Sequence, residues 1–352
     1  MKVLYNRNLH YFALLTVMVA ILLIIAGATV TSTGSGDAVP DWPLSYGALS
    51  PPMKGGILFE HSHRLIAGLT GILIAILAIW LLSKEKRRVV KWMGFAALLA
   101  VVVQATLGGL RVLIVSNASV QDTILSLTGH ASLISSRIII TATHAVLAQS
   151  IVCLIVAIAV MTSRSWINFE DKNIIVSSNV FSVNIVLLAA VFLQLVVGAF
   201  VRHTGSGLII PDFPLSFSKI IPPFGNLPNK ANVPFPISNQ EFLAKVVLQF
   251  SHRILGVIML GLVSYFFVKA RKFEKIAFIP KILLLLTIVQ IILGAVNIWS
   301  RKSVFSTVPH VAIGAIILAL CVASLLKIWC IRISQQTETV LVNHPVKSQL
   351  AI

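Results

Sequence analysis

The sequence predicts an all-α polytopic membrane protein with eight transmembrane helices, arranged as two pseudo-twofold related four-helix bundles. Three observations lead to this fold class. The chain of 352 residues is 57% hydrophobic and only 11% charged, whereas soluble domains carry roughly 25% charged residues. Its apolar residues gather in runs, most of them long enough to cross a bilayer, which takes about 20 residues. Finally, motifs in the first half return in the same order in the second half.

The apolar runs are the candidate membrane helices. The first run is too long and too weakly basic at its start for a signal peptide, and no Ala-x-Ala site follows it, so we interpret it as a retained helix. In chain order the eight runs cover residues 11–31, 57–82, 92–115, 136–162, 180–202, 242–268, 276–299 and 304–331.

Basic residues between the runs predict the orientation. The formal net charge of +17 comes largely from loops around residues 84–91 and 269–281, which fall on the same side as the N-terminus when eight helices are threaded. The positive-inside rule then places both termini in the cytoplasm, with the protein in the cytoplasmic membrane. Because the charge follows the topology, nucleic-acid binding is not expected.

The repeat organises the chain. Residues 33–47 return as residues 204–218 at an offset of 171 without a gap, and His63 then aligns with His252 at an offset of 189. Each half therefore holds four helices, and an even number gives both halves the same orientation, related by an axis along the membrane normal. The predicted parts are an N-terminal bundle (1–162), a cytoplasmic linker (163–179), a C-terminal bundle (180–332) and a cytoplasmic tail (333–352).

The repeated segments 33–47 and 204–218 are expected to be outward turns, because glycine and proline break helices there. Trp42 and Phe213 are expected to anchor at the membrane interface. The turns have two interpretations: they cap a cofactor from outside, or they are plain structural turns.

Four histidines stand out inside apolar runs. His63, His144, His252 and His310 lie in the second, fourth, sixth and eighth runs, all of which cross in the same direction, so the imidazoles should lie at one depth in the outer half of the membrane. Polar groups at such places are expensive and commonly functional. Paired imidazoles in a four-helix bundle favour bis-histidine haem ligation, with the pairs formed within each half.

Zinc and a proton relay are the alternatives to haem. Zinc prefers three or four close ligands, and Cys153, Cys321 and Cys330, which lie within or at the inner ends of the runs, are interpreted as apolar fillers. The remaining histidines are expected at surfaces or interfaces, although His130 is also a candidate to contact a cofactor. These are His10, His61, His130, His203 and His344.

Two charged positions flank the first histidine of each half. Arg64 and Arg253 follow His63 and His252 directly, and either extend to the interface or bind haem propionates. Arg111, Arg137, Arg202 and Arg301 are weaker candidates for the same role.

Three residues before the histidine the halves differ, with Glu60 in the first and Gln249 in the second. A carboxylate can move a proton or stabilise a developing cation, which an amide cannot. We therefore predict that the first half carries chemistry and the second an electron-transfer haem. The plainer interpretation is that Glu60 only bonds to His63 or pairs with Arg64.

At these residues the chain resembles the haem A synthase family, over about residues 10–332. The resemblance implies oxidation of a methyl substituent of haem O to a formyl group, giving haem A for terminal oxidases. It implies that His63, His144 and Arg64 hold the substrate haem O, that Glu60 is the catalytic carboxylate, and that haem B is the resident cofactor. The residues implied for haem B are His252 and His310 as iron ligands, with Gln249 and Arg253 beside them.

The resemblance also implies partners: membrane lipid, a haem O synthase, an electron acceptor and oxidase assembly factors; homo-oligomerisation stays open. Some family members carry a cysteine pair where this chain has Val39 and Ser45, so no disulfide is expected there. Two other functions remain as alternatives, a dihaem electron-transfer cytochrome and, further off, a transporter of haem or another small molecule. The difference between Glu60 and Gln249 favours the enzyme.

Overall fold

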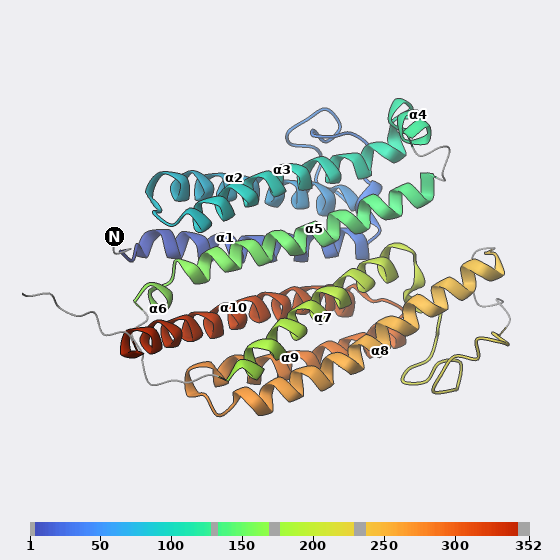
Figure 1. The fold of residues 1–352 in the computed structure, drawn as a ribbon. Coiled ribbons are helices and arrows are strands. Elements are labelled where there is room, and N and C mark those ends of the chain that lie inside the picture. The colour runs from blue at the N-terminus through green and yellow to red at the C-terminus, as the bar shows by residue number, and fades with distance from the viewer. Residues whose placement is uncertain (1–3, 128–132, 169–176, 229–236, 344–352) are drawn as a thin grey trace, which may run out of the picture.

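Long, roughly parallel helices dominate the computed structural model, which describes residues 4–127, 133–168, 177–228 and 237–343 (Figure 1). Within these ranges, eight helices are long and apolar enough to cross a membrane. The predicted all-α polytopic membrane fold is therefore confirmed.

The eight long helices agree with the predicted apolar runs and extend beyond most of them by a few residues. Polar caps explain part of the extension: the Asn6 side chain accepts the Leu9 N–H at the start of α1, and Ser238 accepts the Glu241 N–H at the start of α8. The helices are α1 (Arg7–Ser32), α2 (Gly56–Lys84), α3 (Arg88–Ser116), α5 (Leu133–Met161), α7 (Ser178–His203), α8 (Asn239–Ala270), α9 (Glu274–Trp299) and α10 (Val304–Asn343).

Shorter elements were not predicted. A helix α4 (Ala118–Leu127) follows α3, and one turn of helix, α6 (Arg164–Ile167), lies in the linker between the halves. Two 3-10 turns, η1 (Ser35–Asp37) and η2 (Ser206–Leu208), follow α1 and α7. Helix α10 continues to Asn343, into the predicted C-terminal tail.

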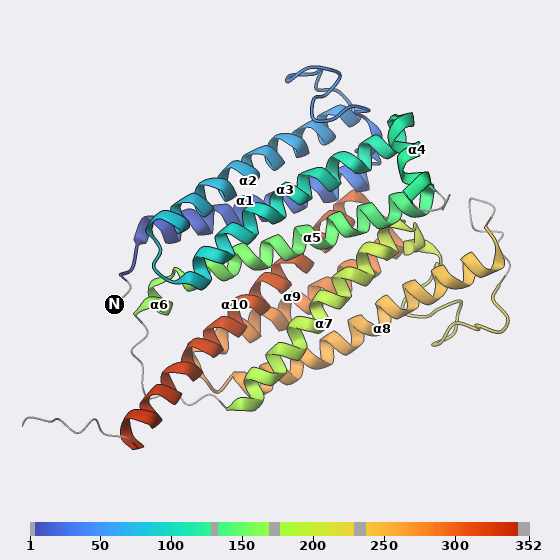
Figure 2. The same cartoon turned by 45° about the horizontal axis from the view of Figure 1, so that its top comes forward.

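The first four long helices pack as a ring, in which α1 contacts α2 and α5, and α3 contacts the same two helices. In the second half α7, α8, α9 and α10 form the corresponding ring. Between the rings, α1 contacts α10, α5 contacts α7, and α5 contacts α10 (Figures 1 and 2). Two bundles related by a twofold axis would pair their helices in this way, although the axis and the domain boundaries stay predictions.

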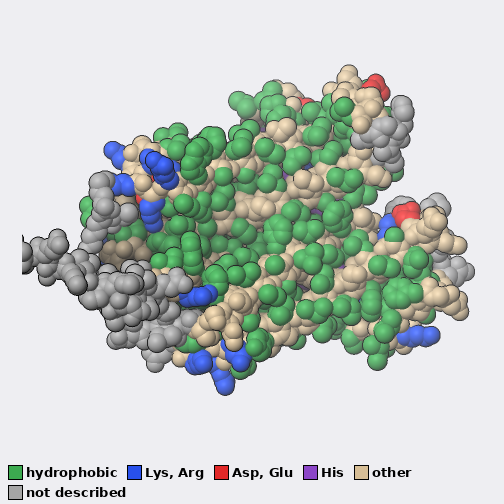
Figure 3. Space-filling model, in the orientation of Figure 1, with side chains coloured by type: hydrophobic (Ala, Val, Ile, Leu, Met, Phe, Trp, Pro, Cys, Tyr) green, Lys and Arg blue, Asp and Glu red, His purple; other side chains and the backbone are tan. Residues whose placement is uncertain are grey.

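Each ring has its own core. Fully buried Leu77 and Ile155 belong to the first, and Phe266 and Leu283 to the second. Hydrophobic side chains also cover the outside of the molecule along the middle of the helices, while lysine and arginine side chains gather mainly at the end that carries the N-terminus (Figure 3). Apolar side chains around the middle and basic side chains at one end are the pattern of a helix bundle that lies in a lipid bilayer.

Candidate functional site

The segments that follow α1 and α7, which are the predicted outward turns, fold into two matching loops. Gly34 and Gly205 adopt left-handed backbone angles, with φ of 67° and 69°, and begin the turns η1 and η2. In each loop an aspartate then closes a tight turn: Asp41 accepts the N–H groups of Tyr46 and Gly47, at 2.7 and 2.8 Å. Asp212 makes the same two bonds one repeat later. The predicted outward turns are therefore ordered by an aspartate that the sequence reasoning did not single out.

Asp41 lies outside the membrane spans, and its ionisation matters for the turn. Burial acts to raise the pKa of this carboxyl, but the N–H groups of Gly47 and Tyr46, with the charge of Arg64, hold the pKa below its usual value. Asp41 is therefore a carboxylate whose hydrogen bonds depend on its charge.

Glu60 and Gln249 make the same contact in their two halves. The Val39 N–H donates to Glu60 Oε2 at 3.1 Å, and the Ile210 N–H donates to Gln249 Oε1 at 2.7 Å. Both side chains are 3% exposed. Each one therefore ties its helix, α2 or α8, to the outward loop that precedes it.

The two side chains differ in the contact that their other terminal atom makes. Glu60 Oε1 pairs with Arg64 Nη2 at 2.8 Å, whereas Gln249 Nε2 donates to the Gly207 carbonyl at 2.8 Å. The pairing of Glu60 with Arg64 is what the plainer interpretation of Glu60 anticipates. No bond from Glu60 to His63 occurs among the described contacts.

Arg64 and Arg253 hold the loops by their backbone carbonyls. Arg64 Nη1 donates to the Asp41 and Leu44 carbonyls, both at 2.7 Å. Arg253 Nη1 donates to the Leu215 carbonyl at 2.8 Å, and its buried Nε has no acceptor among the described residues. The two predicted roles for these arginines were extension to the membrane interface and binding of a haem propionate. Hydrogen bonding to the loop carbonyls was not predicted.

In the second half, the structure brings His252 of α8 and His310 of α10 together. Their ring centres are 6.5 Å apart, with the ring planes at 65°. Two imidazoles on opposite sides of one metal ion have centres about 6 Å apart, because each metal–nitrogen bond is about 2 Å. The two side chains therefore fit ligation of a single iron.

In the first half, the corresponding rings belong to His63 of α2 and His144 of α5. The Nδ1–H of His144 donates to the Gln104 carbonyl at 3.2 Å, and that of His310 donates to the Gln290 carbonyl at 3.1 Å. Such a bond leaves Nε2 as the unprotonated nitrogen, the form that binds a metal. In His144 this Nε2 lies 3.3 Å from the Gln104 Nε2. His63 and His252, by contrast, have a buried Nδ1 with no partner in the described chain.

Each of the four histidine rings lies against a glycine of the preceding long helix. A Cβ at Gly27, Gly108 or Gly198 would lie only 3.0–3.1 Å from Cε1 of the facing ring, and one at Gly294 would lie 3.4 Å away. The pairs are Gly27 with His63, Gly108 with His144, Gly198 with His252 and Gly294 with His310. At Gly27, Gly108 and Gly198 only glycine gives the ring its full space, whereas a Cβ at Gly294 would make an ordinary contact.

A glutamine one turn before the glycine secures three of the four histidine-bearing helices. The Nε2 groups of Gln104, Gln194 and Gln290 donate to the backbone carbonyls of His144, His252 and His310, at 3.0, 3.0 and 2.8 Å. Their Oε1 atoms are buried without a partner in the described chain. Before Gly27 the same position holds Leu23, so the His63 helix lacks this bond.

These glycines and glutamines were missed from the sequence, although a signal was present. Gln-x-x-x-Gly occurs in the third, fifth and seventh runs, and the second, third and fourth of the predicted histidine positions each follow it in the next run. A glycine inside an apolar helix has many causes, so the spacing becomes informative only when the facing histidine is known.

The weaker arginine candidates separate into three groups. Arg137 Nη2 pairs with Asp37 at 2.6 Å, and Arg111 lies 3.9 Å from the same carboxylate. Arg202 reaches from α7 to α1, where its Nη2 donates to the Ala28 carbonyl at 2.7 Å and to Ser32 Oγ at 3.0 Å. Arg301 lies in the exposed turn after α9, with a positive φ of 52°.

The expectation for His61 was wrong. It is buried, with 6% of its surface exposed, and its Nδ1 lies 2.9 Å from Ser45 Oγ. The ring points away from the His63 side of α2 and toward the loop that contains Ser45. His10 and His203 are partly buried, whereas His130 and His344 lie outside the described residues.

The other predicted positions agree with simple packing roles. Trp42 is 41% exposed and lies over Gly109, where a Cβ would approach its ring to 2.6 Å. Phe213 stacks edge-on against Trp299. Cys153, Cys321 and Cys330 are free thiols within helices α5 and α10.

Comparison with known proteins gives a coherent result. A family model described as "Cytochrome oxidase assembly protein" (COX15-CtaA) matches residues 10–322. A protein of Lysinibacillus sphaericus named "Heme A synthase" is 31% identical over 218 residues, which is 61% of this chain and 64% of that protein. Another of that name, from Listeria welshimeri, is 26% identical over 333 residues, or 90% of this chain and 93% of that protein.

Proposed function

The chain belongs to the COX15-CtaA family of cytochrome oxidase assembly proteins, and we propose that it is a haem A synthase, which oxidises a methyl substituent of haem O to a formyl group. Its relatives in Lysinibacillus and Listeria carry that name. In this proposal haem O is the substrate of the first bundle and haem B is the resident cofactor of the second. The protein lies in the cytoplasmic membrane with both termini inside and the haem sites toward the outer face.

The observation that carries the proposal is the matched contact of Glu60 and Gln249. Both side chains accept a loop N–H, from Val39 and Ile210. The amide in the second half shows that this structural task needs only an oxygen acceptor. The negative charge in the first half is therefore not needed for this contact, and its place three residues before His63 suits a carboxylate that acts on a bound substrate.

The residues of the second bundle fit a resident haem. His252 and His310 present two imidazoles 6.5 Å apart, and Gly198 leaves space against the His252 ring. Haem B, when bound, supplies an iron that takes up and passes on electrons. The unpartnered Arg253 Nε is available to a propionate carboxylate, and Gln249 keeps the loop in place beside the site.

In the first bundle, His63 and His144 would hold haem O, with Arg64 keeping the outward loop closed over the site. Conversion of a methyl to a formyl group removes protons and electrons from the carbon and adds one oxygen atom, which water or dioxygen has to supply. The Glu60 carboxylate is the group of this site that can accept such a proton or stabilise positive charge. Arg64, at 2.8 Å from Oε1, fixes the direction of the Glu60 side chain.

Substitution of Glu60 by glutamine tests the proposal, because it gives the first half the side chain of the second. We expect Glu60→Gln to keep its haem B, to accumulate haem O and to produce no haem A, as measured by extraction and chromatographic separation of the haems. Gln249→Glu is the matched control and should still produce haem A. Undiminished haem A in Glu60→Gln would remove Glu60 from the reaction. A wild-type protein that holds two haem B groups and makes no haem A would instead be the electron-transfer cytochrome.

A further inference from the structure

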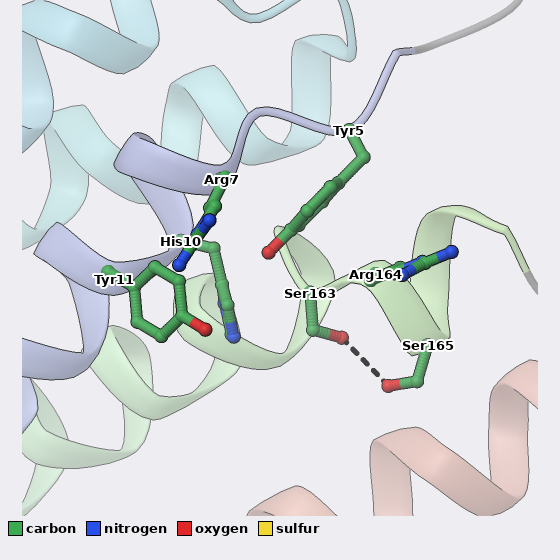
Figure 4. A pocket seen from close by; sticks show the side chains of 7 residues that line it. All are labelled: Tyr5, Arg7, His10, Tyr11, Ser163, Arg164 and Ser165. Carbon is green, nitrogen blue, oxygen red and sulfur yellow. Dashed lines mark hydrogen bonds between the residues drawn. The ribbon is translucent and has the colours of Figure 1, made fainter.

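A second site lies at the other end of the molecule from the four histidines. A cavity of about 430 Å³ opens where α1 begins and α5 passes into α6 (Figures 1 and 4). Its lining is polar and basic: Arg7 and Arg164, the His10 imidazole, and the hydroxyls of Ser163 and Ser165, with Tyr5 and Tyr11 beside them. None of these residues has a part in the proposed reaction.

The two arginines carry charge that the described chain does not neutralise. No described aspartate or glutamate lies within ion-pair distance of Arg7 or Arg164, and none lines the cavity. The Arg7 guanidinium instead lies 5.5 Å from the centre of the Tyr11 ring. His10 is fixed by its Nδ1–H, which donates to the Ala159 carbonyl at 3.0 Å. The arrangement presents several hydrogen-bond donors to an anion.

A smaller, more apolar cavity adjoins the first. It measures about 220 Å³, shares Ser163 and Ser165 with the basic cavity, and is walled by Val160, Trp166 and Ile331. Lys327 of α10 is its one described basic residue. The two cavities together take residues from α1 and α6 and from α9 and α10, and so from both halves of the chain.

We propose that these joined cavities bind an anionic phospholipid, with its phosphate between Arg7 and Arg164 and the start of an acyl chain along the apolar wall. Arginine binds phosphate oxygens through charge-assisted hydrogen bonds. Basic pockets between membrane helices on the cytoplasmic side are a known type of site for anionic lipid head groups. A free phosphate ion would use the basic cavity but would have no use for the apolar one, which favours the lipid.

Lipid binding by matched double variants tests this proposal. The full-length protein, the Arg7→Gln/Arg164→Gln variant and an Arg88→Gln/Arg271→Gln control would be titrated with phosphatidylglycerol in a phosphatidylcholine background and the bound lipid counted by native mass spectrometry. Arg88 and Arg271 are exposed arginines at the same end of the helices, outside both cavities. All four arginines are exposed, so these variants should fold normally.

A basic residue near an anionic head group contributes about fivefold in affinity, so loss of Arg7 and Arg164 should weaken phosphatidylglycerol binding on the order of twentyfold. The control should bind like the wild type. Equal weakening in both variants would mean that only the general surface charge matters, and would overturn the proposal. Glycerol phosphate serves as the chain-free competitor: we expect it not to displace the lipid, and displacement at matched concentration would establish a free-anion site instead. The test is independent of haem content, which should be the same in all three proteins.

Discussion

Gly198 of α7 faces His252 of α8 so closely that a single added carbon would lie 3.0 Å from the imidazole Cε1. Gly27 and Gly108 repeat this close approach to His63 and His144, and Gly294 faces His310 in the same way at the longer distance of 3.4 Å. The proposed iron ligands are therefore placed as much by the absence of a side chain on one helix as by the presence of a ring on the next.

Gly198→Val should displace the His252 ring and reduce the resident haem B. Overpacking of a close contact costs about 1–3 kcal/mol, which the ring can relieve by turning out of its place. The low-spin haem absorption of the purified protein measures the loss. Gly261 in α8 has open space where a Cβ would stand, so Gly261→Val is the matched control and should keep its haem. An unchanged spectrum in Gly198→Val would show that this contact does not position the ligand.

Gln194→Leu should loosen the resident site. The bond from Gln194 Nε2 to the His252 carbonyl at 3.0 Å joins α7 to α8, and such bonds in membranes contribute about 0.6 kcal/mol on average and up to about 1.7. We expect faster loss of haem B to an apo-haem acceptor, followed by absorbance. A release rate equal to that of the wild type would contradict the assigned role.

Leu23→Gln should have the opposite effect in the first half. Leu23 stands one turn before Gly27, where the other three helices carry glutamine, so the substitution introduces the missing donor toward the His63 helix. A substrate site has to release its product, and we expect the variant to retain haem O or haem A longer during purification. The ratio of these haems to haem B measures the effect, and a ratio at or below that of the wild type counts against it.

Glu60→Ala should destabilise the first outward loop far more than Glu60→Gln does. Removal of the carboxylate leaves the Val39 N–H without its acceptor and the Arg64 guanidinium without its ion-pair partner, and breaking one side of a buried ion pair costs about 3–5 kcal/mol. Thermal unfolding in detergent should show a lower midpoint for alanine than for glutamine. Equal midpoints would mean that Glu60 does not hold the loop.

Acid should open the same loop through Asp41. Its pKa is lower in the folded protein than its usual value, so the unfolded loop binds more protons and the stabilisation is complete above the usual value, near pH 4. It is lost as the pH falls through the lowered pKa of the folded state. The acid-dependent part of the fluorescence that Trp42 contributes, obtained by comparison with Trp42→Phe, follows the opening. Asp41→Asn should lack this acid step, and its persistence there would assign the transition to another group.

Much of the fold was predictable because a membrane helix needs a long run of apolar residues, which the sequence shows directly. The eight spans and the turns that follow the first and the fifth of them could each be predicted from local patterns and their repetition, and the same repetition predicts roles for Glu60 and His252. The contacts between helices could not. His61 was assigned to the surface because its partner Ser45 lies on a loop whose path the sequence does not specify. Arg64 was predicted to lie at the membrane interface or to bind a propionate. Its actual acceptors are backbone carbonyls, which every residue has, so the sequence does not show which of them it contacts.

The equivalence of Glu60 and Gln249 as acceptors has a genetic consequence. Glutamate and glutamine codons differ by one base, and either side chain can accept the loop N–H, from Val39 or Ile210. After a duplication, one copy could therefore gain or lose its charge in a single mutational step without passing through an unfolded intermediate. If Glu60 has the proposed catalytic role, that one step would have made the two halves chemically different, while the hydrogen bond that holds the loop was kept.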